Sequence, residues 1–212
     1  MPTTVDFVGK SMAATLTVTN LSQEQTTIQL RVFRWTQPGG RDRYEPSQEI
    51  SISPPIVTVG PGEAQLVRLV REDASGGGER AYRVAIDELP SGGPSQTGLR
   101  MAVQMLIPVF VNVAPDAVPD LRWSASTQGG LTLRAVNDGG RRVRIDDLSV
   151  SSRNGRRIAD LKGLVGYALA GQEFRVTVPV PRSQLGSLGE VAIRANSDKG
   201  PLSGTATTSS TQ

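Results

Sequence analysis

The chain has 212 residues, which suits one large domain or two of ordinary size. It contains no histidine and no cysteine, so the usual general base, the usual metal ligands, thiolate nucleophiles and disulfide bonds are all excluded. With 23 basic and 20 acidic side chains the net charge is only +3, which gives little support for a nucleic-acid partner. The 23 glycines and 14 prolines favour many short strands joined by turns.

Nothing in the sequence predicts a membrane anchor or a leader. No apolar run approaches the ~18 residues that a spanning helix needs. The opening stretch MPTTVDFVGK has neither a basic region nor an apolar core, so no signal peptide is visible. Two readings stay open, a cytoplasmic protein or an exported one whose signal lies upstream of Met1.

The first half of the chain reads as strands and turns. Apolar and polar residues alternate in several short stretches, and glycine- or proline-rich turns such as 60–63 and 74–78 separate them. Residues 37–46 and 91–98 read as polar loops. The predicted strands lie at 13–20, at 26–35, twice within 50–70, at 80–90 and from 99 onward. About seven strands in ~110 residues is typical of an immunoglobulin-like sandwich.

The stretch GLRMAVQMLIPVFVNVAP (98–115) stands apart from the other strands. Every odd position from Leu99 to Val113 is apolar, which predicts a strand much longer than the usual ~5–6 residues. One explanation is an ordinary core strand. The other is a strand with an unpaired edge that accepts a strand from another protein, and the methionines at 101 and 105 suit such an adaptable surface. The residues alone leave both open.

The second half repeats the strand pattern after a linker. Residues 114–120 contain Pro115 and Pro119, which predict a stiff connection and a fixed angle between two domains. Strands are predicted at 121–126, 130–138, 141–152, 173–180 and 190–197. The polar stretch 204–212 is predicted to be a disordered tail. The pattern therefore predicts two β-sandwich domains, 1–115 and 116–212.

Residues that could carry enzymatic chemistry are few. Three adjacent carboxylate pairs occur, Glu72–Asp73, Asp87–Glu88 and Asp146–Asp147. The last two lie on predicted strands, where neighbours point to opposite faces and cannot share a proton or a metal without a bulge, and the first runs into a glycine-rich turn and has no visible partner. The six arginines of 139–157 include no aromatic residue that could stack on bases, and two aspartates interrupt them. We therefore predict no enzyme, no metal and no cofactor.

Several blocks, read in order, resemble the periplasmic chaperones of pilus and fimbria assembly, the PapD-like family. They are PTTVDFVGKSMAATLTVTN (2–20), SPPIVTVGPGEAQLVRL (53–69), YRVAIDELP (82–90) and LRMAVQMLIPVFVNVAP (99–115). The resemblance implies two immunoglobulin-like domains set at an angle in an L shape. It implies a periplasmic protein that caps incomplete pilus subunits by donor-strand complementation and passes them to an outer-membrane usher. The client-binding residues would be Leu99, Met101, Val103, Met105 and Ile107.

The chain also departs from the family pattern. The family's two basic cleft residues, which hold the client's C-terminal carboxylate, are replaced by Thr4 and Pro108. The family has an ion pair between its two domains. Glu88 and Asp198 match its acidic partners, whereas Asn112 stands at the basic position. Glu88 is expected near the hinge. The resemblance also implies an upstream first-strand segment and signal peptide. The alternative function is a two-domain structural or adhesive module, whose last strand would be wholly internal.

Overall fold

The computed structural model describes residues 4–72, 77–89, 103–186 and 188–209. The chain forms two compact units, Met1–Trp35 with Arg43–Pro115, and Thr36–Asp42 with Asp116–Gln212. The sequence pattern predicts 36–42 in the first domain, but this loop packs within the second unit. The Gln37 side chain explains the difference, because its Nε2 donates to the Tyr167 carbonyl at 2.7 Å and its Oε1 accepts the Leu169 N–H at 3.0 Å.

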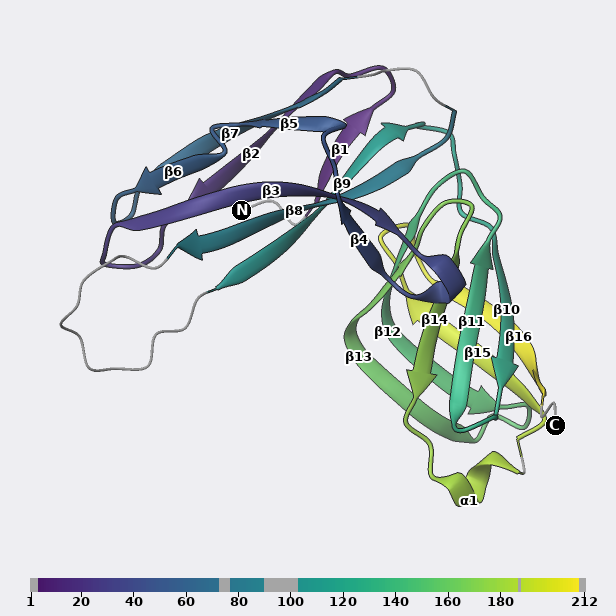
Figure 1. Cartoon of the computed structure of the whole chain (residues 1–212). Helices are drawn as coiled ribbons and strands as arrows, with labels where there is room; N and C mark the ends of the chain where they lie inside the picture. The colour runs from purple at the N-terminus through teal and green to yellow at the C-terminus, as the bar shows by residue number, and fades with distance from the viewer. Residues whose placement is uncertain (1–3, 73–76, 90–102, 187, 210–212) are drawn as a thin grey trace. The chain divides into compact units, whose positions relative to one another are not determined.

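The first unit is a sandwich of two sheets (Figure 1). One sheet has the order β1-β9-β8-β3-β4, with β6 also paired to β3, and the other has the order β2-β7-β5. The predicted loop 37–46 contains a one-turn 3-10 helix, Pro38–Gly40, and β4. The strands are β1 Val5–Val8, β2 Ala13–Thr19, β3 Thr26–Thr36, β4 Arg43–Pro46, β5 Ile50–Ser53, β6 Ile56–Val59, β7 Ala64–Arg71, β8 Arg80–Leu89 and β9 Gln104–Val113.

The core of the first unit follows from the alternation read in the sequence. Inward-facing residues of both sheets are buried, including Leu16 on β2, Val67 and Leu69 on β7, and Val84 on β8, all fully excluded from solvent. Such side chains stabilise the unit by about 1.5–3 kcal/mol each relative to exposure. The immunoglobulin-like, all-β prediction for this half is confirmed.

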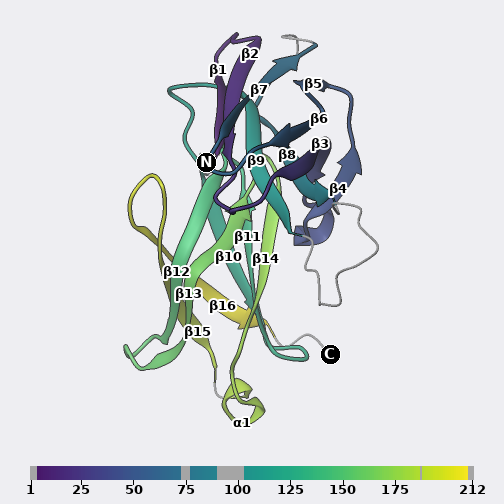
Figure 2. The ribbon, with the colours of Figure 1, turned by 90° about the vertical axis from the view of Figure 1, so that its left-hand side faces the viewer.

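The second unit is one sheet that wraps around its own core, in the order β13-β12-β15-β16-β10-β11-β14. Figure 2 shows β12, β13 and β15 on one side of this unit and β10, β11 and β14 on the other. Its elements are β10 Leu121–Ser126, β11 Leu131–Asn137, β12 Val143–Ser152, β13 Arg157–Ala168, β14 Glu173–Val178, α1 Arg182–Leu185, β15 Glu190–Asn196 and β16 Leu202–Ser209.

Two elements of the second unit correct the sequence prediction. The expected disordered tail is β16 as far as Ser209, antiparallel to β15 and parallel to β10. Its small and polar residues give no apolar alternation, and Gly204 has no room for a side chain, because a Cβ there would overlap the Trp123 ring. Strand β13 was not predicted, because residues 157–168 show no strict alternation and pair with β12 through several bulges.

No helix within the described ranges is long and apolar enough to cross a membrane.

Candidate functional site

The odd-numbered apolar residues of β9 divide into an exposed part and a buried part. Val103, just before the strand, is 49% exposed and Met105 is 37% exposed. Ile107 is half-buried against the core, whereas Val109 and Val111 are 0% and 1% exposed. We call this series of odd-numbered apolar residues, from Leu99 to Val113, the stripe. It therefore extends beyond the residues that pack in the core of the first unit. Leu99 and Met101 lie outside the described residues.

The neighbouring strands explain this division. Strand β8 pairs antiparallel with β9 from Arg80↔Val111 to Asp87↔Gln104. On the other edge, β1 runs parallel to β9 and pairs with it only from Val5↔Val109 onward. Among the residues that the structure describes, no strand pairs with that edge at 104–108. A strand edge with a partly exposed apolar face is the arrangement that β-augmentation uses.

The two positions of the missing basic residues come together. Thr4 and Pro108 each precede by one residue the pair Val5↔Val109, so they are neighbours in the parallel register of β1 and β9. Neither carries a charge, and Pro108 also removes one N–H from the strand. In the register of β8 and β9, Pro108 is paired with a cation, Arg83.

Two contacts fix the position of Arg83. Its guanidinium lies 3.8 Å from the centre of the Trp35 ring, and its Nη1 donates to the Leu106 carbonyl at 3.4 Å. Sequence reasoning missed Arg83 because the register between β8 and β9 places it opposite Pro108, and register is a tertiary property. The alternation of 80–90 indicated only that Arg83 lies on the face opposite Tyr82 and Val84.

The start of β9 is attached to β8 and β3 through Asp87. Its Oδ2 accepts hydrogen bonds from Nε and Nη2 of Arg31 at 3.0 and 2.9 Å, and its Oδ1 accepts one from the Gln104 amide. The Gln104 hydrogen bond, followed by the bond and charge of Arg31, lowers the pKa of the Asp87 carboxyl. Asp87 therefore acts as a structural tie at the point where the exposed part of the stripe begins.

An apolar cavity of about 350 Å³ opens beside this exposed part. Buried Val18, Ile28 and Ile86 contribute to its walls, and Val103 and Met105 line it from the β9 side. Its lining thus joins the core of the first unit to the exposed stripe.

The three residues expected to form an interdomain ion pair have other surroundings. The Glu88 N–H donates to the Val103 carbonyl at 3.1 Å, at the end of β8 opposite to Arg80, the residue that pairs with Val111. Eight residue steps of ~3.3 Å each separate Glu88 from Arg80, so the expectation that Glu88 lies near the hinge is wrong. Asp198 lies in the second unit and its Oδ1 accepts the Arg144 N–H at 3.2 Å.

Asn112, the third of these residues, bends β9 near its end. Its φ is +58°, a left-handed conformation that asparagine tolerates better than most residues. Its Oδ1 accepts a hydrogen bond from Nη1 of Arg71, which is 2% exposed, and Arg71 Nη2 lies 3.5 Å from the Gly9 carbonyl. Asn112 thus satisfies part of a buried cation inside the first unit.

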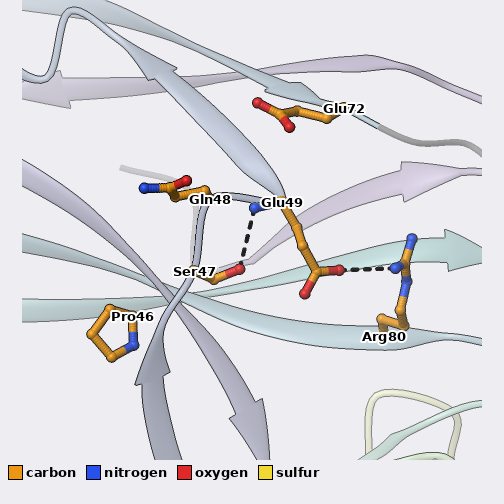
Figure 3. Close-up of a pocket in the computed structure, with 6 residues that line it drawn as sticks. All are labelled: Pro46, Ser47, Gln48, Glu49, Glu72 and Arg80. Atoms are coloured by element: carbon orange, nitrogen blue, oxygen red, sulfur yellow. Dashed lines mark hydrogen bonds and ion pairs between the residues drawn. The ribbon is translucent and has the colours of Figure 1, made fainter.

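A polar cavity of about 520 Å³ lies beside Glu49 (Figure 3). Figure 3 shows the Glu49 carboxylate turned toward Arg80, whose Nη1 donates to Oε2 at 2.8 Å, with Glu72 lying apart. Nη1 of Arg34 donates to both carboxylate oxygens at 3.1 Å, and the Tyr82 hydroxyl donates to Oε2 at 2.6 Å. Burial, and then the bond to Glu49, raises the pKa of Tyr82 to about 12.

This Glu49 cluster joins β3 and β8 to the segment before β5, and its carboxylate is saturated with donors. A general base needs an acceptor that is available to substrate, so the cluster serves structure. The two carboxylates of the pair Asp146–Asp147 have separate partners: Asp146 accepts from Nε of Arg144 at 2.7 Å, and Asp147 accepts the Gly163 N–H at 3.0 Å. Asp73 of the pair Glu72–Asp73 lies outside the described residues. No group of three potential metal ligands occurs in the parts of the chain that the structure describes.

Together, the geometry defines a class of protein: an all-β chain whose first unit presents the partly exposed edge of its last strand. The comparisons identify the family. The sequence model of the pili and flagellar-assembly chaperones, PapD N-terminal domain, matches residues 1–119, and the chain belongs to this family. The chain is 24% identical over 134 residues to the uncharacterized fimbrial chaperone YcbF of Escherichia coli K12, covering 58% of this chain and 56% of the relative's length.

Solved structures share the fold. A chain from the CsuC-CsuE chaperone-tip adhesion subunit pre-assembly complex of Acinetobacter baumannii matches with a TM-score of 0.75 and 22% identity, over 99% of this chain and 97% of that chain. The CupB2 chaperone of Pseudomonas aeruginosa matches with a TM-score of 0.60 and 16% identity, over 98% of each chain. A chain from the Salmonella enterica complex of the SafA pilin with the SafB chaperone gives a TM-score of 0.61 and 21% identity, covering 95% of this chain and 92% of that chain.

Proposed function

We propose that this chain is a periplasmic chaperone that binds incomplete immunoglobulin-like pilus or fimbrial subunits and caps them by donor-strand complementation. The observation that carries the proposal is the division of the stripe into the buried Val109 and Val111 and the exposed Val103 and Met105. Buried residues anchor β9 in its own unit. The exposed ones, with Leu99, Met101 and Ile107, would enter the groove of the subunit.

The physical basis is mutual coverage of two incomplete surfaces. A subunit that lacks its last strand exposes apolar side chains and unpaired backbone groups, which promote aggregation. Full burial of a valine or methionine is worth about 1.5–3 kcal/mol, so a half-exposed residue gains about half of that when a client covers it. Several such residues, with backbone hydrogen bonds along the free edge, give a stable but reversible complex.

The client's C-terminal carboxylate needs a cation, since Thr4 and Pro108 supply none. Arg83 is the best candidate because it pairs with Pro108 across β8 and β9. Guanidinium groups bind carboxylates in a two-pronged geometry that lysine does not reproduce. Substitution Arg83→Gln is therefore expected to weaken subunit capture, while Arg83→Lys restores part of it; equal capture by both variants and by the wild type would remove Arg83 from this role.

The alternative function, a structural or adhesive module, requires that the stripe be internal throughout. The exposure of Val103 and Met105 favours the chaperone over that module. An outer-membrane usher as a further partner, and an upstream signal peptide that directs the chain to the periplasm, are part of the proposal. Cell fractionation of the full-length gene product tests the location, and recovery in the cytoplasm would contradict it.

The experiment that tests the function is co-expression of the tagged chain with the open reading frames adjacent to its gene, followed by affinity purification. We expect a subunit to be recovered as a soluble one-to-one complex, and Val103→Glu to abolish its recovery. If the chain is purified alone and the subunits remain equally soluble without it, the chaperone proposal is wrong.

A further inference from the structure

The apolar cavity beside Val103 and Met105 is a built feature of the first unit. Its inner wall consists of side chains that are 1–6% exposed, on four different strands. Because they already belong to the core, the cavity is an extension of the core that remains open to solvent. The four side chains of the inner wall are Val18 on β2, Ile28 on β3, Val59 on β6 and Ile86 on β8.

The rim opposite β9 is held by the turn at Asn20. The Asn20 Nδ2 donates to the Glu24 carbonyl at 2.7 Å and to the Val59 carbonyl at 3.0 Å, and its Oδ1 accepts the Ser22 N–H at 3.0 Å. These bonds join the β2–β3 turn to the end of β6. The turn therefore has a defined position on the rim and does not depend on a ligand for its shape.

The mostly apolar lining also contains polar side chains, Thr19, Asn20, Ser22 and Thr26, and one carboxyl side chain, Glu88. Glu88 follows Ile86 by two residues on β8, so its side chain lies on the inward face, and it lines the cavity. Within the described part of the chain no side chain donates a hydrogen bond to its carboxylate. Mostly apolar walls with one carboxylate that takes no side-chain donor fit a side chain that has an apolar body and a single donor at its end. Tyrosine and tryptophan have this form, whereas an ammonium group would lose strong hydration on entry.

The location of the cavity indicates where such a side chain comes from. Val103 and Met105 line the cavity and also lead into the edge of β9 that no described strand covers. Directly opposite residues on paired strands place their side chains on the same face. A segment paired with this edge would therefore direct alternate side chains toward the cavity mouth.

We propose that the cavity receives one tyrosine or tryptophan side chain from the subunit segment that pairs with β9, with its O–H or N–H donated to Glu88. This inference rests on the proposed function, since it takes the subunit as the partner. The chaperone then both donates apolar side chains to the subunit and accepts one aromatic side chain from it. The cavity thereby selects among otherwise similar strands by a single residue.

The test uses synthetic peptides Ac-Ser-Thr-Val-X-Val-Thr-Ser-NH2, with X as Tyr, Trp, Phe, Leu, Lys or Ala, and methyl NMR of the full chain. We expect the Tyr and Trp peptides to shift the methyl signals of Val18, Ile86 and Met105. The Tyr peptide is expected to bind about fivefold tighter than the Phe peptide, the effect of one added hydrogen bond. Substitution Glu88→Ala should reduce this ratio to about one, while the matched control Glu24→Ala, on the exposed adjoining turn, should preserve it.

Equal affinities for all six peptides, tightest binding of the Lys peptide, or the absence of shifts at the cavity methyls would each overturn the inference. None of these results affects subunit capture, which tests the proposed function separately. If the wild-type chain selects the Tyr peptide but captures no subunit, the chaperone proposal fails and the cavity's preference for a tyrosine or tryptophan side chain stands.

Discussion

Replacing Val103 or Val111 by glutamate distinguishes the exposed part of the β9 stripe from its buried part. Both valines face the same side of the strand, so the chemical change is identical and only the surroundings differ. Val103 is 49% exposed, and its glutamate can keep its hydration. Val111 is 1% exposed and packs in the core of the first unit, so its glutamate would be desolvated without a partner.

The expected magnitudes differ enough to be measured without ambiguity. A substitution at an exposed site changes the free energy of unfolding by about 0.5 kcal/mol or less. An unpaired buried charge costs several kcal/mol, a large part of the ~5–15 kcal/mol that stabilises a typical domain. With a shift of about 4 °C for each kcal/mol, Val103→Glu should lower Tm by less than about 3 °C and Val111→Glu by more than about 12 °C.

The assay combines thermal unfolding and subunit capture on the same preparations. Val103→Glu should remain folded and lose the subunit, whereas Val111→Glu should lose both. Val103→Thr and Val111→Thr serve as matched controls of nearly unchanged shape, and only Val111→Thr should be destabilised, because its hydroxyl is buried. If Val103→Glu lowers Tm as much as Val111→Glu does, the whole stripe is core and the structural-module alternative is correct. Met101→Glu is expected to behave as Val103→Glu does.

Three further predictions concern the first unit. Asn112→Ala should lower the free energy of unfolding by about 2–3 kcal/mol in a denaturant titration, because it strains a left-handed φ and removes an acceptor from buried Arg71; an unchanged midpoint would contradict this. The pKa of Asp87 is lowered in the folded chain, so its contribution to stability is present above about pH 4 and is lost as the pH falls further, and Asp87→Asn should flatten that part of the stability–pH curve. The pKa of Tyr82 is raised to about 12 in the folded chain. Its contribution to the free energy of unfolding is therefore complete below pH ~10 and is lost as the pH rises toward 12. A tyrosinate absorbance from Tyr82 that appears near pH 10 in the folded chain would refute the hydrogen bond to Glu49.

The sequence by itself determined the strands whose two faces meet different surroundings. Alternation in 13–20, 26–35 and 80–90 predicted β2, β3 and β8, because one face of each carries the apolar side chains that pack in the core. The same alternation identified the long stripe of β9, and the absence of histidine and cysteine removed most enzymatic chemistry. The sequence could not reveal β16, because its small and polar residues show no apolar alternation and Gly204 packs closely against the Trp123 ring.

The tertiary structure alone decided how that stripe is used. Alternation is identical at Val103 and Val111, but Val111 packs in the core, in the part of β9 that β1 also pairs with, whereas Val103 lies before that part and is exposed. Register likewise placed Arg83 opposite Pro108 and moved Glu88 from the expected hinge to the wall of a cavity. These are contacts between residues far apart in the chain, set by strand pairing and packing, and a local sequence pattern carries no information about which strand lies beside it.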